Sequence, residues 1–221
     1  MRDLASELFE LGIALEHAVI CRDDVDVIAG HLTALRERYD LVFTTGGVGP
    51  THDDVTHEAV AKAFGRPLVR SPELAELITS LLADRVTEGH LQMADIPDGA
   101  TLLKSEDVRW PTVIMGNVFV LPGLPKVFRL KLPALCKYLK GDETPFLSRA
   151  LYTLCDEGEL AAVLTELDNR HEDVSIGSYP VTDRQYRVKL TVDGRDPERI
   201  DDIVAALREA IPSEKLVEAE E

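Results

Sequence analysis

The first third of the chain alternates between apolar residues at helical spacing and short apolar runs. Helical spacing predicts helices over residues 4–11, 24–38 and 55–64, whereas the runs Ile13–Cys21 and Leu41–Thr45 predict β-strands. Strands that alternate with helices in this way favour an α/β sheet with helices on its faces.

The same patterning continues as far as residue 139. Pro72–Glu88 predicts a longer helix, Thr112–Leu121 predicts a hairpin, and residues 126–139 predict a further helix. The polar, Gly- and Pro-containing stretch Lys140–Pro145 then predicts a domain boundary. The first domain is therefore expected to span residues 1–140.

The residues beyond this boundary predict a second, smaller α+β domain over residues 145–212. The predicted order of elements is a strand near Ser148–Leu154, a helix over Glu157–Arg170, strands at Val174–Tyr179 and Tyr186–Asp193, and a helix over Pro197–Ala210. This order is typical of a small sandwich of ferredoxin-like or KH-like type. Residues 213–221 are expected to form a frayed acidic tail.

The charge balance excludes several functions. The chain has 221 residues, with 24 Lys and Arg against 40 Asp and Glu, and a formal net charge of −16. This surplus repels nucleic-acid phosphates and anionic lipids, so we expect no nucleic-acid partner and no membrane partner. A negatively charged ligand would need a local binding site with hydrogen-bond donors or positive potential. The apolar runs are too short to cross a bilayer, and the first residues lack the apolar block of a signal peptide. Three widely spaced cysteines support no disulfide framework, so we expect a cytoplasmic protein.

One glycine-rich segment, Thr44–Thr56, is a candidate for such a local anion-binding site. Its sequence, TTGGVGPTHDDVT, lies between a predicted strand and a predicted helix. Gly46, Gly47 and Gly49 let the backbone turn sharply and expose N–H donors, and the following helix N-terminus adds its positive dipole end. The loop can therefore hold a phosphate without Lys or Arg. Its spacing matches neither the dinucleotide fingerprint nor the P-loop.

The last residues of this loop carry acidic and polar side chains. His52, Asp53 and Asp54 follow Thr51 directly, a cluster suited to a divalent cation that bridges to phosphate oxygens. The alternative is that the glycines make only a tight turn and that Asp53 or Asp54 caps the next helix.

A second pair of acids, Asp23 and Asp24, follows the predicted strand that ends near Cys21. The carboxyl ends of parallel strands share one edge of a sheet, where α/β proteins place their ligands. We therefore expect this pair to approach the glycine loop. Asp24 alone is more typical of a helix cap than of a ligand-binding residue.

The segment TTGGVGPTHDDVTHEA, residues 44–59, resembles the signature of the molybdopterin-binding domain of molybdenum-cofactor biosynthesis proteins. The motif GPTHDDVT within this segment is more similar to the competence/damage-inducible protein A family. QMADIPDGA at 92–100 and VFVLPGLP at 118–125 extend the resemblance over most of residues 1–140. The second predicted domain is similar to a KH-like domain of FAD-synthase relatives. The resemblance implies a three-layer αβα domain with a mostly parallel sheet.

The resemblance also assigns roles to individual residues. Asp54 falls on the family's functional acid after the glycine loop, and Asp23 falls on a second one, so both are expected to be catalytic. LPGLPK at 121–126 resembles a second phosphate-contacting turn, which is otherwise a simple strand-to-helix connection. The expected ligand-binding residues are Thr45, Gly46, Gly47, Gly49, Pro50, Thr51, Thr56, Gly123, Pro125 and Lys126, and the candidate metal ligands are His52, Asp53 and Asp54.

The implied cofactor is a divalent metal ion, magnesium, cobalt or nickel, with potassium as a further candidate. The implied ligand is a phosphorylated small molecule of the molybdopterin, FAD or ADP-ribose type. His57 is not expected to be a ligand, because a lone histidine of this kind more often faces solvent. Trp110 could stack on a flat ring, although a single tryptophan more often belongs to the packing.

The chain departs from the family pattern at its start. Family members begin with a strand that carries Gly-Asp-Glu, and this sequence starts at or just after the turn that follows. A late start codon, a trimmed chain or a reduced site would each explain the difference. The length also leaves no room for the deamidase domain of longer members.

Three functions stay open at this point. The first is metal-dependent hydrolysis of a nucleotide diphosphate linkage, as in FAD or ADP-ribose. The second is molybdopterin binding with adenylyl transfer or metal insertion, and the third is a non-catalytic ligand-binding module. The GPTHDD wording and the second domain favour the first. The resemblance also implies a homo-oligomer.

Overall fold

The computed structural model describes residues 2–106, 108–141, 144–182 and 185–218. The chain forms two compact units: a larger unit, Glu16–Leu139, and a smaller unit, which joins Met1–Leu15 to Lys140–Glu221. This grouping differs from the expected division into residues 1–140 and 145–212 at the first fifteen residues. Among the described residues, no helix is both long and apolar enough to cross a bilayer.

A four-stranded mixed sheet forms the centre of the larger unit. Its first two strands are parallel and the other pairings are antiparallel; the order is β1 (Val42–Thr45), β6 (Val118–Leu121), β5 (Thr112–Met115) and β4 (Thr101–Leu103). The predicted hairpin is therefore confirmed as β5 and β6. Thr45 pairs with Leu121, so the two parallel strands end at the same level.

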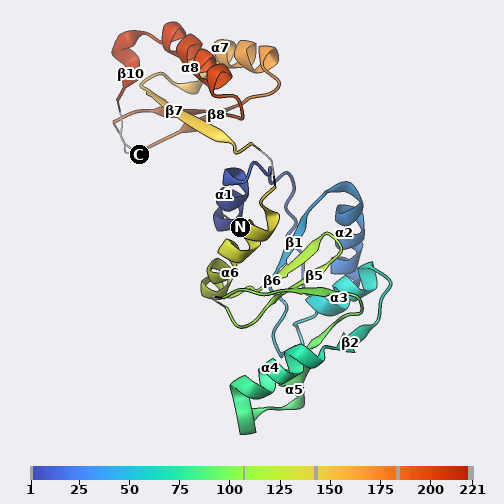
Figure 1. Ribbon diagram of the computed structural model, residues 1–221. Coiled ribbons are helices and arrows are strands. Elements are labelled where there is room, and N and C mark those ends of the chain that lie inside the picture. Colours follow the sequence, from blue (N-terminus) through green and yellow to red (C-terminus); the bar gives the residue numbers. More distant parts are fainter. Residues whose placement is uncertain (1, 107, 142–143, 183–184, 219–221) are drawn as a thin grey trace. The chain divides into compact units, whose positions relative to one another are not determined.

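Helices cover both faces of this sheet (Figure 1). One face carries α2 (Val25–Arg38) and α3 (Thr56–Ala63), and the other carries α6 (Pro125–Leu139). Ala29, Leu32 and Val60 of α2 and α3 are buried in one cluster with strand residues such as Val42 and Val118. The expected α/β class and αβα arrangement are confirmed.

A small subdomain of the larger unit contains a two-stranded antiparallel sheet and short helices. Its elements are β2 (Leu68–Arg70), α4 (Pro72–Leu82), the 3₁₀ turn η1 (Ala83–Arg85), α5 (Glu88–Gln92) and β3 (Asp95–Pro97). Arg70 links them, because its guanidinium donates to Asp95 at 2.7 Å and to Glu88 at 2.8 Å.

The single helix expected over Pro72–Glu88 is wrong. Helix α4 stops at Leu82, and Ala83 has a positive φ of 48°. The side chain of Thr87 then accepts a hydrogen bond from the backbone N–H of His90 and starts α5 as its cap. Thr87 therefore satisfies a donor of a new helix, which apolar spacing alone does not indicate.

The strand expected over Ile13–Cys21 is also absent from the described structure. Residues 13–22 have no ladder partner there, and Ile20 is 95% exposed. An extended segment becomes a strand only when a neighbouring strand takes up its backbone groups. The apolar, β-branched residues of this stretch were therefore a misleading signal.

The smaller unit is an α+β sandwich with a four-stranded antiparallel sheet. The strand order is β10 (Leu216–Val217), β7 (Leu147–Thr153), β9 (Val188–Gly194) and β8 (Ser175–Pro180). The helices are α1 (Arg2–Glu10), α7 (Glu157–Arg170) and α8 (Pro197–Ala210), with the 3₁₀ turn η2 (Ser213–Lys215). Strand residues Leu151, Leu190 and Val192 form its core with Ile200, Ile203 and Leu207 of α8.

Both ends of the chain take part in this unit. The ring of Phe9 in α1 stacks on Phe146 with their centroids 5.1 Å apart, and Arg195 donates to the carbonyl of Gly12 at 2.6 Å. These contacts explain why the first residues group with the last. The expectation of a frayed tail is wrong for residues 213–217, since Leu216 and Val217 pair with β7.

Candidate functional site

Two glycine turns meet at the carboxyl ends of the parallel strands β1 and β6. Gly46 and Gly47 follow β1 with φ angles of 93° and 65°, which disfavour residues with a side chain. Gly123 follows β6, and a Cβ added there would lie 3.1 Å from the Cα of Gly46. The close contact between the turns therefore favours glycine on the β6 side, because a side chain there would require a small shift of the neighbouring turn.

Thr56, the first residue of α3, holds the glycine loop through two hydrogen bonds. The hydroxyl of Thr56 donates to the carbonyl of Gly46 at 2.9 Å, and the N–H of Thr56 donates to the carbonyl of Gly47 at 2.9 Å. In the described part of the chain, the N–H groups of Gly47 and Val48 donate to no acceptor. The loop thus has two N–H groups free for a ligand, while the carbonyls of Gly46 and Gly47 accept hydrogen bonds from Thr56.

A cavity of about 450 Å³ lies against these turns. Its volume is in the range of small-molecule sites. Glycines 46, 47, 49 and 123 contribute backbone to its wall, and Asp54, His57 and Lys131 contribute titratable groups. The remaining lining is mostly apolar: Val48, Met93, Trp110, Pro111, Val113, Val120, Pro122, Leu124 and Val127.

Asp54 is tied to the loop that carries it. One carboxylate oxygen accepts hydrogen bonds from both the N–H and the hydroxyl of Thr51. Partial burial raises the pKa of Asp54, but the hydrogen bonds from Thr51 and from the backbone of Gly49 outweigh burial, so the pKa lies below its ordinary value. Asp54 is therefore a charged group at neutral pH and a weak proton acceptor.

Two further titratable groups of the cavity are buried. His57 is 9% exposed, and burial lowers its pKa to about 4, although a hydrogen bond with the backbone of Asp95 acts in the opposite direction. Lys131 is 3% exposed, and burial lowers its pKa to about 8. At neutral pH the cavity therefore presents a neutral imidazole and a charged ammonium.

The buried imidazole makes a prediction about acid stability. The pKa of His57 falls from an ordinary 6.5 to about 4 in the folded chain, so the unfolded chain binds the proton more tightly. This contribution to stability is complete above pH 6.5 and is lost as the pH falls to 4, by about 3 kcal/mol in all. Chemical denaturation of His57→Gln between pH 7 and 4 should show a shallower loss than the wild type. His52→Gln, at an exposed histidine, should match the wild type; equal slopes for His57→Gln would contradict the prediction.

The structure brings together only part of the predicted ligand-binding set. Gly46, Gly47, Gly49, Gly123 and Asp54 line the cavity. The other predicted residues are not among its lining: Thr45, Pro50, Thr51, Thr56, Pro125 and Lys126. Several of these support the loop instead, as the hydroxyl of Thr45 does by donating to the carbonyl of Pro122 at 3.2 Å.

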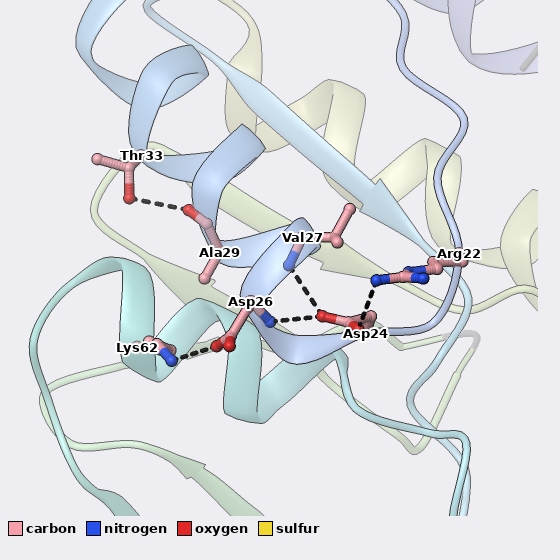
Figure 2. Close-up of polar contacts among 7 residues, drawn as sticks. All are labelled: Arg22, Asp24, Asp26, Val27, Ala29, Thr33 and Lys62. Carbon is pink, nitrogen blue, oxygen red and sulfur yellow. Dashed lines mark hydrogen bonds and ion pairs between the residues drawn. The ribbon is translucent and has the colours of Figure 1, made fainter.

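Asp23 does not share the cavity lining with the glycine loop, and its expected catalytic role stays a prediction. Asp23 is exposed and does not line the cavity. Asp24 caps α2, accepting from the N–H groups of Asp26 and Val27 at 3.0 and 3.1 Å, and it pairs with Arg22 (Figure 2). The interpretation of Asp24 as a cap is confirmed. The strand that was expected to carry these acids to the edge of the sheet is absent from the described structure.

The predicted metal ligands do not form a complete site by themselves. His52 and Asp53 are exposed and lie outside the cavity lining, and only Asp54 belongs to it. Among the described residues, no group of three or more His, Cys, Asp or Glu side chains is arranged to hold a metal ion. The described side chains therefore supply no preformed cluster of three such ligands, and the divalent metal ion stays a prediction.

Sequence reasoning missed His57, Met93 and Lys131 as lining residues and favoured a packing role for Trp110. The missed signal for Lys131 was its position in the helix. It lies at helical spacing between Phe128 and Leu135, so a charged residue occupies the apolar stripe of α6. His57 likewise lies between buried residues of α3.

Comparisons with known families agree with this geometry. The family model described as "Probable molybdopterin binding domain" matches residues 2–141, and the model described as "FAD synthase, middle domain" matches residues 145–220. The crystal structure of the protein CinA with unknown function from Thermoplasma acidophilum is similar, with 29% identity and a TM-score of 0.56. The matched region covers 62% of this chain and 85% of the CinA chain.

Curated relatives come from several kingdoms. A "Probable FAD synthase" of Caenorhabditis elegans is 30% identical over 94% of this chain and 45% of its own length. A "CinA-like protein" of Kosmotoga olearia is 30% identical over 97% of this chain and 54% of its own length, and a protein of Pyrococcus abyssi is 31% identical over 91% and 85%. The chain spans about half the length of the first two. The family model covers more than half of this chain, which therefore belongs to the molybdopterin binding domain family, with CinA-like proteins and FAD synthases among its relatives.

Proposed function

We propose that the chain binds a phosphorylated small molecule in the glycine-loop cavity and hydrolyses a nucleotide diphosphate linkage, as in FAD or ADP-ribose. The observation that carries this proposal is the pair of free N–H groups at Gly47 and Val48 beside the carboxylate of Asp54. Unpaired backbone N–H groups of a glycine-rich loop bind phosphate without a basic side chain. They suit a chain whose net charge is −16.

In this proposal the loop N–H groups bind the phosphate, and Asp54 positions the attacking water. The N–H groups of Gly47 and Val48 bind a phosphoryl oxygen and stabilise the charge that develops there. Asp54 accepts a hydrogen bond from the attacking water and orients it; the water's proton passes to solvent, because the lowered pKa makes Asp54 a weak base. A new P–O bond forms from water, and the bridging P–O bond breaks to give AMP and FMN, or AMP and ribose 5-phosphate.

A second candidate function is molybdopterin binding with adenylyl transfer; the family match supports the molybdopterin-binding part of it. The two functions separate in one assay. Purified protein is incubated with FAD or ADP-ribose, and separately with molybdopterin and ATP, in each case with EDTA or with Mg²⁺, Co²⁺ or Ni²⁺ in buffers with and without K⁺. We expect release of AMP from FAD or ADP-ribose in a metal-containing sample. Adenylated molybdopterin as the only product would favour the second function, and binding without any product would favour a non-catalytic module.

Self-association accompanies the proposed function. The outer edge of β1 has no partner strand in the described chain, and Ile20 is almost fully exposed. Unpaired sheet edges and exposed apolar residues favour association between copies. We expect a dimer or a trimer by sedimentation at micromolar concentration. A stable monomer under these conditions would contradict this expectation.

A further inference from the structure

Lys131 is a buried cation in the wall of the cavity. Its Nζ donates to the carbonyl of Trp110 at 2.6 Å and to the hydroxyl of Thr112 at 3.1 Å. An ammonium group has three N–H donors, so one donor remains after these two bonds. Only 3% of the residue is exposed, and that residue lines the cavity.

This ammonium has no acidic partner in the described chain. Its two hydrogen-bond partners are neutral, and burial is the one influence on its pKa. A buried charge without a counter-ion is costly, and buried charges in proteins are normally paired. In a chain with 40 acidic residues, the missing partner beside Lys131 points to an anion supplied by the ligand.

We propose that Lys131 forms a second anion subsite of the glycine-loop cavity and selects ligands with two adjacent anionic groups, such as the diphosphate of a dinucleotide, over ligands with one phosphate. The inference rests on the proposed function and adds to it the charge of the substrate. The N–H groups of Gly47 and Val48 bind one phosphoryl group, and the ammonium binds the next. Lys131 is therefore a specificity-determining residue.

A purely structural role makes a different prediction. As an anchor between α6 and the start of β5, Lys131 needs only its hydrogen bonds to Trp110 and Thr112. An anchor does not depend on the charge state of the ligand. As an anion subsite, Lys131 needs its charge, so affinity for a diphosphate should follow the ionisation of the ammonium.

The other charged groups around the cavity do not change over the same pH range. The pKa of Asp54 lies below its ordinary value, and the pKa of His57 is about 4. Arg109, next to Trp110, donates a hydrogen bond to Ser80 and does not line the cavity. Between pH 6.5 and 9.5, Lys131 is thus the titrating group among the described residues that line the cavity.

Calorimetric titration with α,β-methylene ADP-ribose, which resists hydrolysis, and with AMP tests the proposal. We expect the wild type at pH 7 to bind the diphosphonate at least tenfold more tightly than AMP, and to lose affinity for it towards tenfold per pH unit above pH 8. Lys131→Met should bind the diphosphonate at least tenfold more weakly at pH 7, with no dependence on pH and little change for AMP. Lys137→Met, which removes an exposed lysine from the same helix, should match the wild type.

The pH profile of the wild type keeps the test valid even if Lys131→Met fails to fold. Diphosphonate affinity that stays constant from pH 6.5 to 9.5 would overturn the inference while leaving the proposed function in place. Equal affinity of Lys131→Met and the wild type for the diphosphonate would do the same. Failure of the wild type to bind either compound would overturn the proposed function and the inference together.

Discussion

Replacing Asp54 by alanine is expected to lower the rate of diphosphate hydrolysis by about a hundredfold or more, which is the usual loss when a group that orients the nucleophile is removed. Affinity for the substrate should change much less, because the phosphate is bound by backbone N–H groups. The carboxylate also accepts two hydrogen bonds from Thr51, so the variant should lose about 1 kcal/mol of stability. Turnover and binding of ADP-ribose, with a denaturation curve for each variant, measure these effects.

Two companion variants separate chemistry from loop structure. Asp54→Asn keeps an oxygen acceptor for Thr51 but removes the negative charge, so it should be as inactive as the alanine variant. Thr51→Val removes the hydroxyl that donates to Asp54 but keeps the backbone donor and the carboxylate, so it should lose less than about fivefold in rate. Normal turnover in Asp54→Asn, or a loss in Thr51→Val as large as in Asp54→Ala, would make Asp54 a structural latch.

Much of the fold followed from local patterns, because those patterns coincide with complete local interactions. The predicted helices over Glu157–Arg170 and Pro197–Ala210 match α7 and α8, since each has an aspartate cap and an apolar stripe that meets a sheet. The hairpin of β5 and β6 was equally local, with Gly116 at a φ of 57° in its turn. Ile13–Cys21 had a strand's composition, but a strand depends on a distant partner that composition does not indicate.

The site likewise has a part that local sequence predicts and a part that depends on tertiary packing. The glycine loop was predictable, because its glycines are adjacent in the chain and serve one turn. The cavity also depends on His57 and Lys131, whose positions in it arise from the packing of α3 and α6 against the sheet ends. For Asp23 the sequence argument assumed a strand over Ile13–Cys21, which the described structure does not contain; Asp23 does not line the cavity, and its expected role stays a prediction. The motif thus indicated the loop, whereas only the packing of α6 revealed a charged residue in the lining of the same cavity.

Replacing Gly47 by alanine is expected to weaken ligand binding at the cavity. A Cβ at this position would lie 2.3 Å from the hydroxyl oxygen of Thr56, and the φ of Gly47 is 65°. The left-handed backbone costs about 1–2 kcal/mol, and the steric conflict adds about 1–3 kcal/mol, so the loop must move. Movement displaces the N–H donors of Gly47 and Val48, and affinity for ADP-ribose should fall at least about tenfold, as expected for the loss of one or two hydrogen bonds to a charged group.

Gly65→Ala is the matched control for this change. Gly65 has a φ of 62°, close to that of Gly47, but an added Cβ there meets no atom within 4 Å. This variant should lose only the backbone contribution, about 1–2 kcal/mol, and should bind ADP-ribose like the wild type. The difference between the two variants isolates the contact with Thr56 from the strain of the backbone. Wild-type affinity in a folded Gly47→Ala protein would show that the loop is a turn and that the phosphate binds elsewhere.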